Sequence, residues 1–466
     1  MDRLPRVMIT APASGSGKTL ITCAILRILS AEGISPAAFK CGPDFIDPMF
    51  HEKVLGIPSG NLDIFLQGEG GMKESLQRLM SGKDIAIIEG VMGFFDGYGE
   101  SLSEGASYDI CVSTATPAIL VVNCRGMSRS IIPVIKGYIN YFTDSAEKRD
   151  GSQIIRGVIL NNISPGIEKK IAVMIEEELN IPVIGHLPPL KKEVFGSRHL
   201  GLILPDEVPG VLARIDEVAG ELKKSLDIEK LLEIAKTAGV HTGDLNCTED
   251  FSNGHFRVHI SDENACVGVA MDEVFCFYYS DNLELIKHMG AEIKLFSPIH
   301  DRELPDVTGI ILGGGYPELH GRDLSENKTM RQCIKEASES GMPILAECGG
   351  YLYLKEGLTD PNGVKWDMVG VFEGESFKRD KLSHFGYINM FADVDTPYLK
   401  AGESVRGHEF HYYETTGGRH VCDMRKPAGQ RHWPGMEVKD NTFGGFAHLY
   451  YPSNPEFIRR FLSLQR

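Results

Sequence analysis

The chain has 466 residues, 42% of them hydrophobic and 24% charged, which is the composition of a soluble globular protein large enough for two domains. Its formal net charge of -16 argues against a nucleic-acid partner, because phosphate backbones are bound through clustered Lys and Arg. No apolar run approaches the roughly 18 residues that a membrane-spanning helix needs, so we expect no membrane partner.

The cysteines and the N-terminus indicate the cellular compartment. The ten cysteines form no C-x-x-C pair and no dense framework, so we expect reduced thiols in the cytoplasm. Residues 1–6 lack the apolar segment of a signal peptide.

The first half of the chain alternates short apolar runs with helical patterns, which predicts parallel β-α units. Because the runs are almost continuously apolar, we expect a sheet that helices cover on both faces. The expected strands are Val7–Thr10, Ala37–Lys40, Ile85–Ile88, Ala118–Val122, Gly157–Leu160 and Pro182–Gly185, with helices at Thr19–Glu32 and Ile167–Leu179.

A phosphate-binding loop is predicted between the first strand and the first helix. Backbone N–H groups of such a loop converge on phosphate oxygens, and the helix N-terminus adds its positive end. Pro12 stands where the G-x-x-x-x-G-K-T pattern has its first glycine, so the loop is a variant. The expected ATP-binding residues of the loop are Ser14, Gly15, Ser16, Gly17, Lys18 and Thr19.

The type of phosphate loop is informative. Ala13 stands where ParA/MinD-like ATPases carry a second lysine. The loop is more similar to that of dethiobiotin synthetase, which implies phosphorylation of a carboxylate-type oxygen.

Charged residues follow the next strands at the sheet edge where ligands collect. Lys40 is expected to neutralise phosphate charge. We expect Mg²⁺ to bind with ATP through the Thr19 hydroxyl and the carboxylates of Asp44, Asp47 and Glu89, because Mg²⁺ prefers oxygen ligands. Asp44 and Asp47 are equally explained as turn caps.

Asn161 closes the fifth expected strand. We expect it to contact adenine, although asparagine also caps helices.

A change in pattern marks the domain boundary. The stretch from Glu217 to Ala238 is charged and helical, and residues 239–264 are polar with little periodicity. We therefore predict a first domain at 1–238, a linker at 239–264 and a second domain at 265–466. Expected strands of the second domain are Val267–Ala270, Ile293–Phe296, Gly309–Leu312 and Pro343–Ala346.

Cys348 is the candidate nucleophile of the second domain. It follows a buried strand and precedes two glycines and a helical start, which predicts a nucleophile elbow with Cys in place of Ser. Only the thiolate is a good nucleophile, so a base is required. The alternative is a buried structural cysteine. Backbone N–H groups of Gly314, Gly315 and Gly349 are the expected oxyanion hole.

His448 is the expected base, far downstream in an apolar segment. Many glutaminases carry Glu two residues after the His, whereas this chain has Tyr450. Another group must therefore orient His448, or it acts in a dyad.

His408 and His411 have a spacing that, on one helix, can bind Zn²⁺. No third ligand is evident, so we favour a substrate-binding role for both, and a surface or capping role is the alternative.

The chain resembles the cobyrinate a,c-diamide synthase family along nearly its whole length. Related cobyric acid synthases typically have an Asn-rich segment after the second-strand lysine, where this chain has G-P-D-F-I-D-P. Tyr450 agrees with the resemblance, since this type of glutaminase lacks the His-x-Glu carboxylate. The matching segments are residues 14–19, 42–48, 89–97, 198–202, 313–315 and 407–412, together with Cys348.

The resemblance implies an α/β fold with an N-terminal P-loop domain of the dethiobiotin-synthetase type and a C-terminal class I glutamine amidotransferase domain. It implies ATP-dependent amidation of the a- and c-acetates of cobyrinate, through an acyl phosphate, with glutamine or free ammonia as nitrogen source. Arg198 and His199, near Lys191 and Lys192, are candidates for binding the polycarboxylate.

Alternatives stay open at this point. Hydrogenobyrinate or nickel sirohydrochlorin could replace cobyrinate, because the sequence does not reveal the central metal. A CTP-synthase-like ligase is a further alternative, but it would carry a glutamate at position 450, where this chain has tyrosine. A non-enzymatic alternative is a P-loop ATPase scaffold or sensor with an inactive glutaminase-like domain. A homodimer is compatible with the sequence, which does not fix the oligomeric state.

Overall fold

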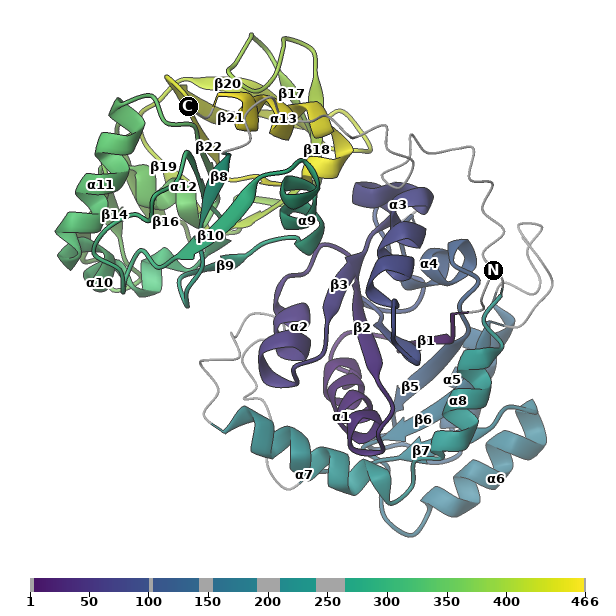
Figure 1. Ribbon diagram of the computed structural model, residues 1–466. Coiled ribbons are helices and arrows are strands. Elements are labelled where there is room, and N and C mark those ends of the chain that lie inside the picture. Colours follow the sequence, from purple (N-terminus) through teal and green to yellow (C-terminus); the bar gives the residue numbers. More distant parts are fainter. Residues whose placement is uncertain (1–3, 100–103, 142–153, 191–209, 240–264, 465–466) are drawn as a thin grey trace. The chain divides into compact units, whose positions relative to one another are not determined.

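The computed structural model describes residues 4–99, 104–141, 154–190, 210–239 and 265–464 (Figure 1). The chain divides into two compact units, Met1–Cys247 and Thr248–Arg466. Most of the predicted linker lies outside the described residues, as do Lys191, Lys192, Arg198 and His199. None of the described helices is both long and apolar enough to cross a membrane.

A seven-stranded parallel sheet forms the centre of the first unit, in the order β3-β2-β4-β1-β5-β6-β7. The six expected strands are confirmed, and the short strand β3 at the edge was not expected. The strands are β1 (Arg6–Thr10), β2 (Pro36–Cys41), β3 (Ser59–Leu62), β4 (Ile85–Glu89), β5 (Ala118–Asn123), β6 (Ile155–Asn161) and β7 (Val183–His186).

Helices cover both faces of this sheet (Figure 1). Side chains alternate along a strand, so Met8 packs in the core with α3, α4, α5 and α6, while Val7 and Ile9 pack in the core with α1, α7 and α8. The helices are α1 (Lys18–Ala31), α2 (Ile46–Met49), α3 (Ile64–Leu79), α4 (Ser107–Ser113), α5 (Ile131–Asn140), α6 (Glu168–Leu179), α7 (Val211–Lys223) and α8 (Ile228–Lys236).

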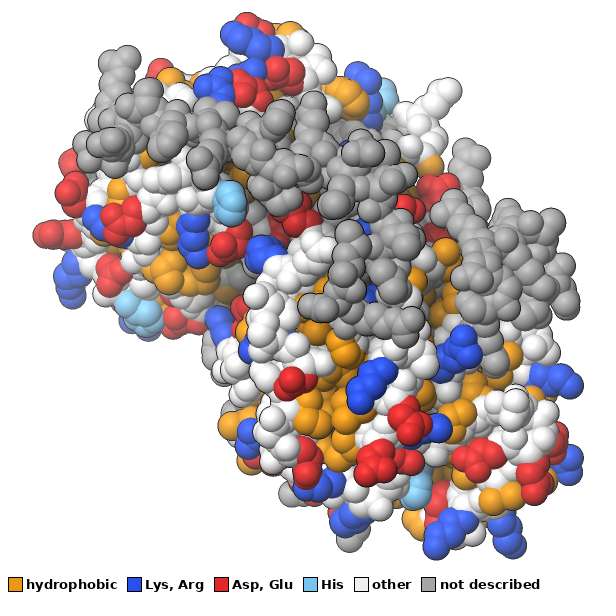
Figure 2. Space-filling view, turned by 45° about the vertical axis from the view of Figure 1, so that its right-hand side comes forward, with side chains coloured by type: hydrophobic (Ala, Val, Ile, Leu, Met, Phe, Trp, Pro, Cys, Tyr) orange, Lys and Arg blue, Asp and Glu red, His pale blue; other side chains and the backbone are white. Residues whose placement is uncertain are grey.

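Charges of both signs are interspersed on the face of the molecule that Figure 2 shows. Between α1 and α7, for example, Arg27 Nε lies 2.6 Å from Asp216 Oδ1. Both side chains are exposed, so such pairs add little stability.

A ten-stranded mixed sheet forms the centre of the second unit, in the order β10-β8-β11-β13-β22-β21-β20-β17-β18-β23. Its first five strands are parallel, and four of them match the expected strands; β22 and the antiparallel remainder were not expected. These strands are β8 (Cys266–Ala270), β10 (Glu292–Phe296), β11 (Gly309–Leu312), β13 (Ile344–Glu347), β17 (His384–Ala392), β18 (Ser404–His411), β20 (His420–Arg425), β21 (His432–Lys439), β22 (Thr442–Gly445) and β23 (His448–Leu449).

Helices and two small sheets complete the second unit. One core contains residues of α9 and α13, and the other contains residues of α10, α11 and α12. The helices are α9 (Ser280–His288), α10 (Gly321–Glu326), α11 (Lys328–Glu339), α12 (Gly349–Leu354) and α13 (Pro455–Ser463). The strands of the small sheets are β9 (Phe275–Phe277), β12 (Gly314–Gly315), β14 (Gly357–Thr359), β15 (Lys365–Asp367), β16 (Glu375–Lys378) and β19 (Tyr413–Thr415).

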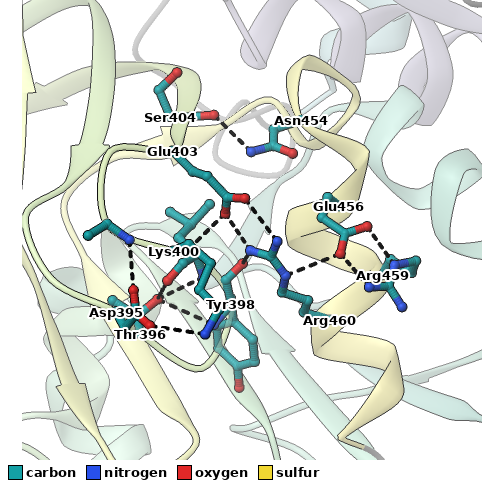
Figure 3. Close-up of polar contacts among 12 residues, drawn as sticks. Asp395, Thr396, Tyr398, Lys400, Glu403, Ser404, Asn454, Glu456, Arg459 and Arg460 are labelled. Atoms are coloured by element: carbon teal, nitrogen blue, oxygen red, sulfur yellow. Dashed lines mark hydrogen bonds and ion pairs between the residues drawn. The ribbon is translucent and has the colours of Figure 1, made fainter.

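Helix α13 is tied to the turn that precedes β18 (Figure 3). Arg460 places Nη2 2.9 Å from Glu403 Oε1 and Nε 3.2 Å from Glu456 Oε1. Just before the helix, Asn454 Nδ2 donates to Ser404 O at 3.0 Å. These contacts brace the strand that carries His408 and His411.

A buried ion pair anchors the end of α12, the helix that follows Cys348. Lys355 and Glu437 are both almost completely buried, and Lys355 Nζ lies 2.7 Å from Glu437 Oε1. The Tyr351 hydroxyl donates to the same carboxylate oxygen at 2.5 Å, and Lys355 also donates to Glu373 O at 2.9 Å. Because water cannot solvate these buried charges, each is stabilised mainly by the opposite charge of its partner.

We predict that Glu437→Ala lowers the free energy of unfolding of the second unit by about 3–5 kcal/mol, because Lys355 then stays buried without a counter-charge. Both tryptophans, Trp366 and Trp433, belong to this unit, so urea unfolding followed by tryptophan fluorescence reports on it. Lys365→Ala, which removes the exposed pair with Glu375, is the control and should change little. Equal effects of the two substitutions would contradict the prediction.

Candidate active sites

The phosphate loop connects β1 to α1 and depends on glycine. Gly15 and Gly17 have φ angles of 74° and 94°, a backbone conformation that favours glycine. A Cβ atom on Gly17 would lie 2.3 Å from Asn161 Nδ2, so no side chain fits there. Asn161, at the end of β6, donates from Nδ2 to Ser16 O at 2.9 Å. Its side chain therefore braces the loop, and its contact with adenine stays a prediction.

Lys18 is held within this loop. Its Nζ donates to Met92 O at 2.6 Å and to Ala13 O at 3.2 Å. Burial, and then the positive charge of Lys40, lower the pKa of Lys18 to about 8. A phosphate group would supply a charged acceptor and favour the ammonium form.

A cluster of buried charges lies beside the loop, at the carboxyl ends of β2 and β4. Thr19 Oγ1 donates to Glu89 Oε1 at 2.5 Å, and Lys40 Nζ lies 3.0 Å from the same oxygen. Lys40 also forms an ion pair with Asp47. Burial opposes ionisation of Glu89, but the charge of Lys40, the nearby His51 and the hydrogen bond from Thr19 outweigh it and hold the pKa of Glu89 below its ordinary value. Glu89 is therefore a carboxylate at neutral pH.

His51 is a member of this cluster that the sequence analysis missed. It is fully buried, with Nδ1 3.1 Å from Ser59 Oγ and Nε2 3.6 Å from Glu89 Oε2. His51 comes from a π-helical turn, Phe50–Val54, and Ser59 begins the unexpected strand β3. No short motif marks either residue, because only the pairing of β3 with β2 brings them to Glu89.

The oxygen atoms of this cluster fit Mg²⁺ in their chemistry. The Thr19 hydroxyl and the carboxylates of Glu89 and Asp47 are the hard donors that Mg²⁺ prefers. Asp44 instead accepts a hydrogen bond from the Ile46 N–H at 2.8 Å, the turn-capping role that we had considered for it. In the described part of the chain, no group of three His, Cys, Asp or Glu side chains is arranged to hold a metal. Phosphate oxygens would therefore have to supply further ligands.

Cys348 occupies the expected elbow in the second unit. It lies between β13 and α12 with φ 47° and ψ -102°, a strained conformation for a residue other than glycine. The Cys348 N–H donates to Gly445 O at 2.7 Å. A Cβ atom on Gly350 would lie 2.2 Å from Leu312 O, so the helix after the elbow can approach β11 only because this residue is glycine.

The glycine segment and His448 meet at the elbow. A Cβ atom on Gly349 would lie 3.0 Å from Gly315 N, so the backbones of these residues are in contact. A Cβ atom on Gly314 would lie 2.2 Å from His448 Cε1, so the imidazole packs directly on this glycine. The structure thus brings together the residues that the sequence analysis assigned to the glutaminase site.

The thiol and the imidazole are both neutral in the protein without substrate. Burial, followed by the negative charges of Glu318 and Glu409, raises the pKa of the Cys348 thiol well above its ordinary value. Burial, followed by His408 and His411, lowers the pKa of His448 to about 3. A thiolate–imidazolium pair is therefore not the resting state at neutral pH.

Tyr450 does not replace the missing carboxylate of the His-x-Glu pattern. Its hydroxyl donates to Asp281 Oδ2 at 2.7 Å, and its ring packs edge-on against Tyr279. The Tyr450 side chain thus contacts Tyr279 and Asp281, at the start of α9.

His408 and His411 lie on a strand, so the helical zinc spacing that we considered does not occur. Side chains alternate along β18 and place the two histidines on opposite faces. His411 Nδ1 lies 2.7 Å from Tyr413 O, and its ring stacks on Phe446 at 3.9 Å. His408 is paired across the strands with His448. A substrate-binding role for either histidine stays a prediction.

Comparisons with known proteins cover both units. Residues 7–196 match the CobQ/CobB/MinD/ParA nucleotide binding domain, and residues 266–456 match the CobB/CobQ-like glutamine amidotransferase domain. The chain is 36% identical to the cobyrinate a,c-diamide synthase of Listeria innocua serovar 6a, over 97% of this chain and 98% of the relative. It is 36% identical to that of Caldanaerobacter subterraneus subsp. tengcongensis and 35% identical to that of Clostridium tetani, over 98% of this chain and 97% and 99% of those relatives.

These matches confirm the two-part α/β architecture, with a nucleotide-binding unit followed by a glutamine amidotransferase unit. The matches argue against the alternative of an inactive scaffold, because the relatives named as synthases match both the nucleotide-binding unit and the glutamine amidotransferase unit. The chain belongs to the cobyrinate a,c-diamide synthase family and is a glutamine-dependent amidating ligase.

Proposed function

We propose that this chain converts cobyrinate to cobyrinate a,c-diamide, using ATP to activate each carboxylate and glutamine to supply each nitrogen. The observation that carries the proposal is the presence, in one chain, of a phosphate loop with the Thr19–Glu89 contact and an elbow at which His448 packs on Gly314. The names of the relatives support the choice of substrate.

The glutaminase reaction begins when Cys348 Sγ attacks the side-chain amide carbon of glutamine and His448 takes the thiol proton. Backbone N–H groups of Gly349 and of Gly314 or Gly315 stabilise the oxygen that becomes negative. His448 returns the proton to the nitrogen, the C–N bond breaks and ammonia leaves. Water then hydrolyses the thioester to glutamate and restores the thiol.

The amidation reaction needs an activated carboxylate, because ammonia does not displace oxide from a carboxylate. A substrate carboxylate oxygen attacks the γ-phosphorus of ATP, and ADP leaves. Ammonia then attacks the acyl carbon, and phosphate leaves with the oxygen. Lys18 and Lys40 would neutralise charge on the phosphates. Mg²⁺ bound with ATP, held by Thr19, Glu89 and Asp47, would supply further positive charge there. Repetition at the second acetate gives the diamide.

The substrate is tested directly by mass spectrometry. The protein is incubated with ATP, Mg²⁺ and glutamine and with a panel of tetrapyrrole acids, including cobyrinate, hydrogenobyrinate and nickel sirohydrochlorin. We expect two acid-to-amide mass shifts with cobyrinate. Preference for another member of the panel would overturn the choice of substrate.

We predict that Cys348→Ala lowers glutamine-dependent amidation by about three orders of magnitude or more, because the nucleophile is lost. Amidation with ammonium chloride should continue at the wild-type rate, since the phosphate loop is intact. Product formation is measured by chromatography with each nitrogen source. Loss of both activities would contradict the division of labour between the two units.

Lys18→Ala should lower amidation from either nitrogen source by about 100-fold or more, because a positive charge on the transferred phosphoryl group is lost. Glutamine hydrolysis should persist in part. The measurement pairs product formation with glutamate release. An unchanged rate of ATP-dependent amidation would show that the loop is assigned wrongly.

The neutral resting state of Cys348 predicts slow alkylation. Only thiolates react rapidly with iodoacetamide, and the raised pKa of Cys348 keeps the thiolate fraction low through pH 8. Peptide mapping by mass spectrometry should show slower labelling of Cys348 than of the partly exposed Cys333. Faster labelling of Cys348 at pH 7 would indicate a pre-formed thiolate instead.

A further inference from the structure

Asn61, in the edge strand β3, has no place in the mechanism above. It stands opposite Lys40 in the pairing of β3 with β2. Its Nδ2 donates to Gly42 O at 2.8 Å and to Asp44 O at 2.7 Å. The two N–H bonds of one side-chain amide thus serve two carbonyls of the loop that leads from Lys40 to Asp47.

Hydrogen bonds continue from this loop into α2, the helix that carries Asp47. Asp44 Oδ1 accepts from the Ile46 N–H at 2.8 Å, and Ile46 is the first residue of α2. Asp47 follows directly and forms the buried ion pair with Lys40. The loop that Asn61 holds at two carbonyls therefore determines where the Asp47 carboxylate lies.

Ser59, two residues before Asn61 on β3, holds the other end of the same segment. Its Oγ lies 3.1 Å from His51 Nδ1, and its N–H donates to Glu52 Oε1 at 3.2 Å. Side chains two residues apart lie on the same face of a strand, so Ser59 and Asn61 act from one face of β3. Strand β3 therefore contacts the segment on both sides of Asp47.

We propose that Asn61 is a positioning residue of the Mg²⁺–ATP site, which holds the loop before α2 so that the Asp47 carboxylate stays beside the phosphate loop. The proposal rests on the proposed binding of Mg²⁺ by Thr19, Glu89 and Asp47. Groups that orient metal ligands through hydrogen bonds typically change metal affinity by about 10–100-fold when they are removed. Asn61 holds the loop before α2 and not the phosphate loop, so its loss should weaken the binding of nucleotide with Mg²⁺ and spare that of nucleotide alone.

The test measures binding of adenylyl imidodiphosphate, an ATP analogue that is not hydrolysed at its β–γ bridge, by isothermal titration calorimetry in Mg²⁺ or in EDTA. We expect Asn61→Ala to weaken binding in Mg²⁺ by about 10-fold and binding in EDTA by less than about twofold. Asn61→Leu keeps the volume of the side chain but donates no hydrogen bond, so it should show the same loss. If Asn61→Ala does not fold, Asn61→Leu decides the question.

Two control variants remove similar hydrogen bonds elsewhere. Asn327 Nδ2 also donates to two backbone carbonyls, Pro298 O at 2.9 Å and Asp301 O at 2.7 Å, but in the second unit. The Ser225 hydroxyl donates to His186 O at 2.6 Å, at the opposite edge of the sheet that contains β3. Asn327→Ala and Ser225→Ala should leave binding unchanged in Mg²⁺ and in EDTA.

Combination with Asp47→Asn separates positioning from general support of the fold. If Asn61 acts through Asp47, Asn61→Ala weakens the binding of Asp47→Asn in Mg²⁺ by less than about twofold. An equal loss in both backgrounds, an equal loss in Mg²⁺ and EDTA, or unaltered binding by Asn61→Leu would overturn the proposal. If Mg²⁺ did not strengthen binding by the unaltered protein, the proposed function on which it rests would fall instead.

Discussion

The glutaminase site depends on the close approach of three backbone segments that have no side chains between them. Gly349 and Gly350 let the elbow come against the segment that contains Gly314 and Gly315, and Gly314 leaves room for the imidazole of His448. A side chain at any of these glycines would occupy the space of a neighbouring backbone or ring. The strained conformation of Cys348 persists because these contacts, and the hydrogen bond of its N–H to Gly445 O, hold it in place.

In the nucleotide-binding unit the controlling constraint is charge rather than space. Lys40, Glu89 and Asp47 are buried together. The free energy needed to remove such charges from water can exceed the Coulombic attraction within a single ion pair. Lys40 and Glu89 lie at the carboxyl ends of β2 and β4, and Asp47 lies in α2; the position of this cluster beside the phosphate loop gives a functional reason to retain it. The hydrogen bond from Thr19 to Glu89 connects the phosphate loop directly to this cluster.

The sequence predicted an element correctly where the pattern that identifies it lies within one strand or one loop. Buried parallel strands such as β1 and β5 contain the uninterrupted apolar runs Val7–Ile9 and Ala118–Val122, and the elbow at Cys348 is a local pattern of strand, small residues and helix. Strand β3, Ser-Gly-Asn-Leu, has no such run, and β18 alternates buried with half-exposed residues, including the two histidines that we considered on a helix. His51 escaped notice because its partners, Ser59 and Glu89, lie in two strands, and only the folded sheet brings them together.

The neutral resting pair at the elbow has a consequence for catalysis. Since neither the Cys348 thiol nor the His448 imidazole is ionised before glutamine arrives, proton transfer between them must create charge inside a buried site. The negative charge is stabilised only when it has moved from the sulfur to the amide oxygen of glutamine, where backbone N–H groups can donate hydrogen bonds to it. The rate then depends less on the basicity of His448 than on how accurately thiol, imidazole and N–H groups are placed together. Strand β23 is only two residues long, and the buried Asn282 holds the backbone that follows His448: its Nδ2 donates to Leu449 O at 2.8 Å and its Oδ1 accepts from the Tyr451 N–H at 2.9 Å.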